Sequence, residues 1–123
     1  LRLEIYNDIS NAKNDYAIDH IISKLEDVYG PIPNYLKNLF SLTRVKIEGN
    51  RIKADKIKIN KENTVITLNP KSLIDNDKLI NHYVLKNKIK LTDQYNLKYQ
   101  NISKDNFCEL CEEVISMMKD ISD

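Results

Sequence analysis

The 123-residue sequence has few of the residues on which nucleotide sites and membrane anchors depend. It contains two glycines and no tryptophan. Gly30 and Gly49 are too far apart to form a phosphate-binding loop. There is no run of about 18 apolar residues to span a membrane, and no signal peptide is visible. We therefore expect no cofactor, no small-molecule substrate and no membrane contact. Because the chain opens on Leu1 at helical rhythm, we expect it to be cut from a longer polypeptide.

Cysteine and histidine are equally scarce. Cys108 and Cys111 have the spacing of half a zinc site, but a structural zinc needs four ligands and no second pair is present. Two free cysteines fit a reducing, cytoplasmic protein. His20 and His82 are isolated from each other and from any nucleophile. The sequence therefore predicts no metal site, no catalytic residue and no enzyme activity.

Charged residues make up 30% of the chain and the net charge is only +1, but the charge is uneven. Residues 51–104 hold twelve basic and five acidic groups, whereas residues 105–123 hold one basic and six acidic groups. A basic segment in the middle of the chain can form a nucleic-acid-binding surface. It can equally be attracted to the acidic tail within one fold, and this second interpretation is favoured.

The stretch 27–33 holds one of the two glycines and two of the three prolines. Gly30 suits the left-handed backbone just past a helix end. Pro31 cannot continue that helix, and Pro33 suits the first turn of a new one. We therefore predict a sharp corner between two helices.

Apolar residues at helical spacing predict three helices within residues 1–52, the second capped by Asn14 and the third running through Gly49. The expected buried positions are Ile5, Tyr6, Ile9 and Ala12; Ile18, Ile21, Ile22, Leu25 and Val28 or Tyr29; and Leu36, Leu39, Phe40, Thr43 and Ile47.

Within residues 53–123 the period changes to alternation. Residues 56–59 and 65–68 predict one hairpin, and residues 89–91 and 95–99 predict a second across Asp93. A short helix lies between them near 79–84, and a last helix begins near Ser103. The fold class is therefore α+β with a small, mostly antiparallel sheet, in a single domain of residues 1–123.

Two surface features leave alternatives open. The first is a set of seven lysines, which either protects strand edges, the favoured interpretation, or binds phosphates: Lys53, Lys56, Lys58, Lys61, Lys86, Lys88 and Lys90. The second is Glu26 and Asp27, in a helix's last turn, where the helix dipole disfavours acids. They are either plain surface charge or the contact for a basic partner.

Several segments together resemble the C-terminal domain of the bacterial transcription-repair coupling factors (Mfd). They are the Arg-Leu-Glu-Ile-Tyr opening at 2–6, the Asn-Ala-Lys at 11–13, the acid-x-x-Gly-x-x-Pro corner ending at Pro33, and Thr-Arg-Val-Lys at 43–46. The match is good over about residues 2–57. The family's helix-ending glycine falls at Lys53.

The resemblance implies an autoinhibitory regulatory domain without a motor motif. Such a domain packs on the N-terminal UvrB-like module of its own polypeptide, an ATP-driven DNA translocase that acts on RNA polymerase, and hides the UvrA-binding surface. The family's acidic contact maps to Asp27, beside Tyr29. The acid one turn earlier falls at Lys24, and Glu26 is its candidate replacement. The alternative function is a nucleic-acid-binding module using the lysine-rich hairpins.

Overall fold

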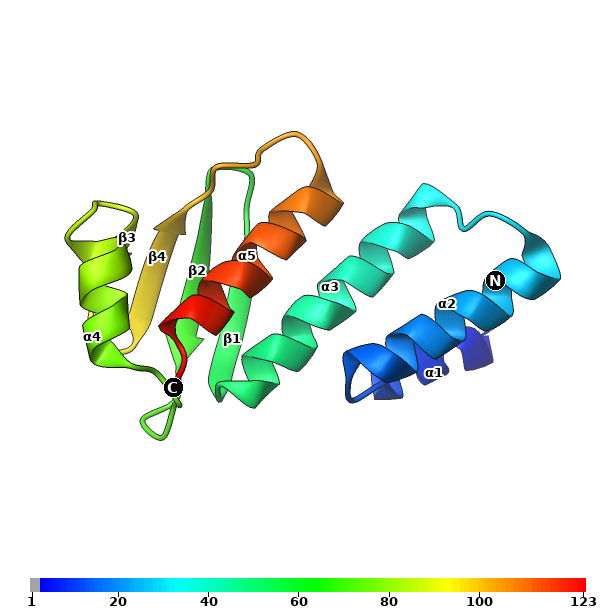
Figure 1. Cartoon of the computed structure of the whole chain (residues 1–123), viewed down its shortest axis with the longest axis horizontal. Helices are drawn as coiled ribbons and strands as arrows, with labels where there is room; N and C mark the ends of the chain where they lie inside the picture. The colour runs from blue at the N-terminus through cyan, green and yellow to red at the C-terminus, as the bar shows by residue number, and fades with distance from the viewer. Residues whose placement is uncertain (1–2) are drawn as a thin grey trace.

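A computed structural model describes residues 3–123, so Leu1 and Arg2 of the expected first helix lie outside the described residues. The fold is α+β, as predicted (Figure 1). The elements in order are α1 (Leu3–Asn11), α2 (Asp15–Tyr29), α3 (Asn34–Arg51), β1 (Ala54–Ile59), β2 (Asn63–Leu68), α4 (Asn76–Leu79), the π-helical turn η1 (Ile80–Val84), β3 (Ile89–Leu91), β4 (Asn96–Gln100) and α5 (Phe107–Ile121). None of the described helices is long and apolar enough to cross a membrane.

The two predicted hairpins form one four-stranded sheet in the order β1-β2-β4-β3. Every neighbouring pair is antiparallel, and β2 joins the hairpins by pairing Ile66 with Leu97. Asp93 shapes the second hairpin, because its Oδ1 accepts hydrogen bonds from the backbone N–H of Tyr95 (2.9 Å) and Asn96 (3.0 Å). The helices α3 and α5 lie on one face of this sheet (Figure 1).

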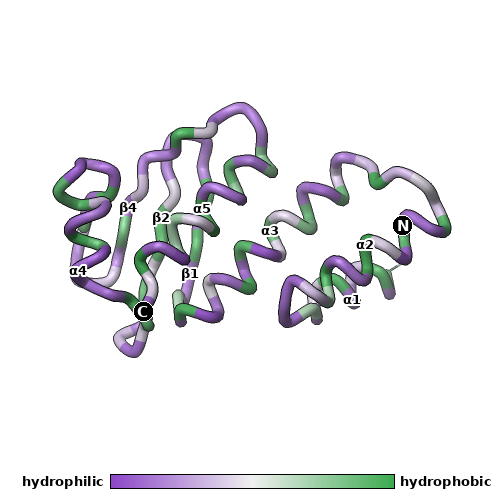
Figure 2. The backbone as a smooth tube through the Cα atoms, in the orientation of Figure 1, coloured by the Kyte–Doolittle hydropathy of each residue, from purple (hydrophilic) through white to green (hydrophobic). Residues whose placement is uncertain are grey.

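The longest helix, α3, contributes to two hydrophobic clusters. Its first half supplies Leu36 and Phe40 to a small cluster with α1 and α2. Its second half supplies Val45, and the residue that follows the helix, Ile52, packs in the same large cluster against the sheet and α5. Figure 2 shows hydrophobic positions recurring along the whole helix. The predicted stripe from Leu36 to Ile47 describes only the face of α3 that packs in the small cluster.

Some predicted positions are wrong in detail. Tyr6 is exposed, and both Val28 and Tyr29 are exposed, because Ile32 beyond the corner closes the end of the small cluster instead. The last helix begins later than Ser103, since the side chain of Asn106 caps it by accepting from the N–H of Glu109. Ile57 and Ile59 of the first hairpin pack against the large cluster.

As expected, α3 continues through Gly49, which is buried at the contact with β1. A Cβ placed on Gly49 would lie 2.6 Å from Ile57 Cδ1. The helix ends instead before Lys53, whose φ of 62° lies in the left-handed region. A residue with a side chain is disfavoured in this conformation, so the chain here carries local strain.

Replacing Lys53 with glycine should therefore raise the free energy of unfolding by about 0.5–1 kcal/mol, because glycine tolerates the left-handed backbone. Urea denaturation would measure the change. Lys56→Gly, inside β1, is the control and should lower stability by about the same amount. A loss of stability in Lys53→Gly would contradict the account of the helix end.

Candidate functional site

The corner between α2 and α3 has the backbone that the glycine and prolines predict. Gly30 has φ of 80° and donates its N–H to the carbonyl of Glu26 at 2.9 Å, which ends α2. No atom lies within 4 Å of a Cβ built on Gly30, so the conformation and not the space requires glycine. Pro33 lies one position before α3 as its N-cap, and its carbonyl accepts from the N–H groups of Leu36 and Lys37.

The helix α2 presents its charged residues on two different flanks. One flank faces α3, where Arg44 forms ion pairs with Asp15 (3.2 Å) and Asp19 (2.5 Å). Glu26 lies seven residues, or about two helical turns, after Asp19, so it shares this flank. Lys24 and Asp27, three residues apart, share a different, exposed face. The predicted interface residues therefore all lie at the exposed end of α2, but they do not form one charged stripe.

The last turn of α2 contains acidic residues and no basic residue. The helix dipole makes this end partly negative, so an acid here costs about 0.3–1 kcal/mol. By contrast, Asp15 lies in the first turn of α2, where the dipole stabilises an acid. The charge at Asp27 is thus unfavourable for the helix that carries it.

Removing that charge should stabilise the domain. We expect Asp27→Asn to raise the free energy of unfolding by about 0.3–1 kcal/mol, because the repulsion between the carboxylate and the helix end is lost. Thermal unfolding at low ionic strength would measure it. Glu112→Gln, an exposed position in the middle of α5, removes the same charge and should leave stability unchanged. Equal effects of the two variants would argue against a helix-dipole cost.

Large apolar side chains that neighbour these acids in the sequence are exposed. Val28 is 72% exposed, Tyr29 is 63% exposed, and Tyr35 in the first turn of α3 is 58% exposed. Exposed apolar groups are found on surfaces that contact a partner, and tyrosine is enriched at interfaces. We refer to Glu26, Asp27, Val28, Tyr29 and Tyr35 as the corner surface. Helical periodicity alone placed Val28 or Tyr29 inside, so the sequence analysis missed Val28 and Tyr35.

The cysteines and histidines are the other potentially reactive side chains. Cys111 is fully buried, and this burial raises the pKa of its thiol to about 12. The Cys108 thiol donates to Asn38 Oδ1 at 3.4 Å. His20 is exposed, and His82 Nδ1 lies 3.1 Å from Asp120 Oδ2. Across residues 3–123, no three histidine, cysteine or acidic side chains are grouped to hold a metal ion.

The structure defines a small α+β domain with exposed acidic and aromatic side chains at the corner between α2 and α3. The TRCF domain family model matches residues 1–79, so the chain belongs to the TRCF domain family. The family resemblance expected from the four sequence segments is confirmed.

The chain is also similar to two known proteins. The chain is 24% identical over 121 residues to the transcription-repair-coupling factor of Buchnera aphidicola subsp. Acyrthosiphon pisum, covering 98% of the chain but only 15% of the relative. Its fold is similar to a crystal structure of the C-terminal domain of a transcription-repair coupling factor, with a TM-score of 0.69 at 15% identity. That match covers 95% of this chain and 80% of the solved chain.

Proposed function

We propose that this domain is the autoinhibitory clamp of a transcription-repair coupling factor. In this proposal the corner surface docks on the N-terminal UvrB-like module of the same polypeptide and covers the module's UvrA-binding surface. The domain itself performs no reaction. RNA polymerase and double-stranded DNA are then partners of the whole translocase in the cytoplasm, and they reach this domain only indirectly.

The corner surface is the single observation that carries the proposal. Its acids are unfavourable at the end of an isolated helix, and Asp27 has no ion-pair partner among residues 3–123. A basic partner surface would offset that cost. Val28 and Tyr29 beside it supply apolar area that docking would remove from water. The membership in the TRCF domain family supports the choice of partner.

A clamp of this kind needs only a modest interface. When two modules share one polypeptide, the linker holds them at an effective concentration of up to about the millimolar range. A contact with a micromolar dissociation constant then stays closed almost all the time. A motor that changes the relative position of the modules can open it by conformational work of a few kcal/mol. Such a contact is strong enough to inhibit and weak enough to release.

Calorimetric titration of this chain into the separately produced N-terminal module tests the docking. We expect saturable binding that weakens as salt increases, because acids meet a basic surface. Tyr29→Ala should weaken the binding, and Leu85→Ala, an equally exposed apolar residue after η1, should leave it unchanged. If no binding is detected at about 100 μM of either protein, or if both variants behave alike, the corner surface is not the docking site.

A further inference from the structure

The face of the sheet opposite α5 carries an unneutralised row of lysines. In the register of the sheet, Lys58 of β1 pairs with Val65 of β2, Val65 pairs with Lys98 of β4, and Lys98 pairs with Lys90 of β3. These side chains alternate with the buried residues that face α5, so all of them lie on the outer face. We call Lys58, Lys98 and Lys90 the lysine row.

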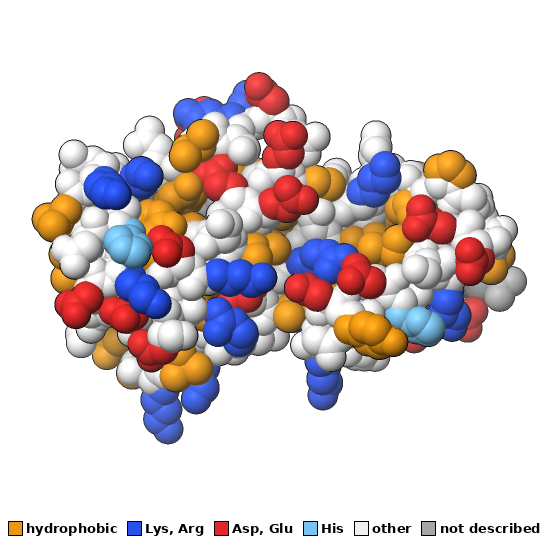
Figure 3. Space-filling view, in the orientation of Figure 1, with side chains coloured by type: hydrophobic (Ala, Val, Ile, Leu, Met, Phe, Trp, Pro, Cys, Tyr) orange, Lys and Arg blue, Asp and Glu red, His pale blue; other side chains and the backbone are white. Residues whose placement is uncertain are grey.

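The lysine row has no compensating acid. No ion pair or side-chain hydrogen bond is present at Lys58, Lys90 or Lys98 within residues 3–123. Glu62, at the rim, is already engaged by Lys104 at 2.7 Å. The exposed acids of α5, such as Glu109 and Glu112, lie over the opposite side of the sheet, where Figure 3 shows acidic side chains gathered.

The acidic tail therefore does not neutralise the lysine row of the basic middle segment. Among the described residues, one ion pair joins the two segments, between His82 and Asp120. The favoured expectation, that the two segments attract each other within one fold, stays a prediction, but the sheet separates α5 from the lysine row. The alternative expectation, a phosphate-binding footprint, therefore concerns the lysine row.

Protection of sheet edges does not account for the whole row. Lys58 and Lys90 do lie on the edge strands β1 and β3, where lysine discourages pairing with another chain. Lys98, however, lies on β4, which has a neighbour on each side and no edge to protect. The sequence analysis did not include Lys98 in its lysine set, because only the strand order brings it between the other two.

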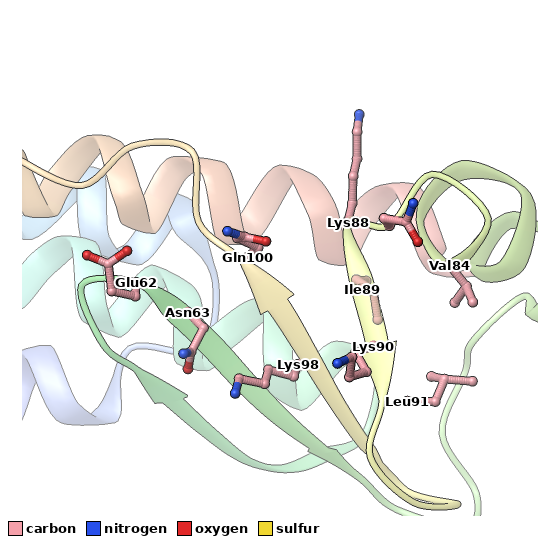
Figure 4. A pocket seen from close by; sticks show the side chains of 10 residues that line it. Glu62, Asn63, Val84, Lys88, Ile89, Lys90, Leu91, Lys98 and Gln100 are labelled. Carbon is pink, nitrogen blue, oxygen red and sulfur yellow. The ribbon is translucent and has the colours of Figure 1, made fainter.

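The shape of the surface favours a linear anion. Neighbouring strands lie about 4.8 Å apart, so the row extends over roughly 14 Å from β1 to β3. A groove of about 610 Å³ lies along β3 and β4 beside it, and Figure 4 shows Lys90 and Lys98 next to each other at this groove, with Asn63 and Gln100 nearby. The surface thus combines regularly spaced positive charge with amide side chains that can bond phosphate oxygens.

The same face is poorly suited to a protein partner or to single-stranded nucleic acid. On the outer face of β1, β2 and β4, Val65 is the one apolar residue among those described. The exposed Leu91 lies on the edge strand β3, so the face has no central apolar cluster of the kind a protein interface has. Among the described residues, no aromatic side chain lies on this face for bases to stack on, since Tyr99 points into the buried cluster. Contacts from lysine to phosphate alone position a duplex without reading its sequence.

We propose that the lysine row binds the phosphate backbone of double-stranded nucleic acid without sequence preference. This site lies on the sheet and is separate from the corner surface, so it does not rest on the clamp proposal. Non-specific binding of this kind has dissociation constants of about 10⁻⁴–10⁻⁶ M at physiological salt and weakens steeply as salt rises.

Fluorescence anisotropy with a labelled DNA duplex of about 20 base pairs, at salt from about 50 to 200 mM, tests the proposal. The triple variant Lys58→Gln, Lys90→Gln, Lys98→Gln should make the dependence of log affinity on log salt less steep by about 2–3. The control triple variant Lys13→Gln, Lys37→Gln, Lys46→Gln removes the same charge from exposed positions of the helical part. It should leave the slope unchanged.

Three results would overturn the proposal. They are no binding of the duplex at the lowest salt, an equal loss of slope in both triple variants, and binding of poly-glutamate as tightly as the duplex, which would indicate an acidic protein partner. Lys98→Gln alone, at one exposed position, keeps the test valid if the triple variant unfolds. It should reduce the slope by about 1.

Discussion

The variant Asp27→Arg should dock on the N-terminal module about 5- to 150-fold more weakly, which corresponds to about 1–3 kcal/mol. The substitution places a cation where the proposed partner surface is already basic, so attraction becomes repulsion. The domain itself should not be destabilised, because a cation in the last turn of α2 interacts favourably with the helix end. Calorimetry measures the dissociation constant, and thermal unfolding measures the stability.

The combination of weaker docking and undiminished stability separates this result from damage to the fold. Glu112→Arg is the control, since it makes the same charge change at an exposed position of α5. It should dock like the unmodified chain. An unchanged dissociation constant for Asp27→Arg would remove Asp27 from the interface, and an equal loss in both variants would indicate only a general effect of net charge.

The second large effect is expected at Glu113, which ties α5 to the chain leaving β4. Its carboxylate accepts from the Tyr99 hydroxyl at 2.6 Å and from the backbone N–H groups of Ile102 at 2.8 Å and Ser103 at 2.7 Å. Glu113→Ala should lower the free energy of unfolding by about 2–4 kcal/mol, because three donors lose a charged acceptor and Tyr99 is buried. Urea denaturation would measure this. Glu112→Ala, the exposed neighbour, should change stability by less than about 0.5 kcal/mol.

The same contacts predict how stability depends on pH. Burial acts to raise the pKa of Glu113, but the hydrogen bonds from Tyr99, Ile102 and Ser103 outweigh it and hold the pKa below its usual 4.5. A carboxyl whose folded pKa is lowered contributes stability above the unfolded pKa, and this is lost as pH falls through the folded value. The stability of Glu113→Gln should therefore change less below about pH 4.5 than that of the unmodified chain. Parallel curves for the two would contradict the assignment.

Local chemistry explains why the sequence predicted the corner and the hairpins. Gly30 permits the left-handed backbone that ends α2, and Pro33 fixes its own φ before α3, so both helix ends follow from local residues. Alternation of buried and exposed residues likewise places the strands, and Asn14 caps α2 by accepting from the N–H of Ala17, as expected. None of these features depends on a distant part of the chain.

The features that the sequence did not predict depend on distant contacts. The second face of α3, with Val45, is buried by α5 and the sheet, which no pattern within the helix reveals. The exposure of Tyr29 depends on where α3 begins, and the position of Lys98 between Lys58 and Lys90 depends on the order of the strands. Both candidate surfaces thus use residues whose burial or neighbours are set by tertiary structure.

The most direct test of the clamp is the binding of UvrA to the separate N-terminal module, with and without this chain. The proposal predicts that increasing amounts of the chain raise the apparent dissociation constant of UvrA, and that Asp27→Arg raises it much less at the same concentration. If UvrA binds the module equally well at saturating amounts of the unmodified chain, this domain does not cover the UvrA-binding surface.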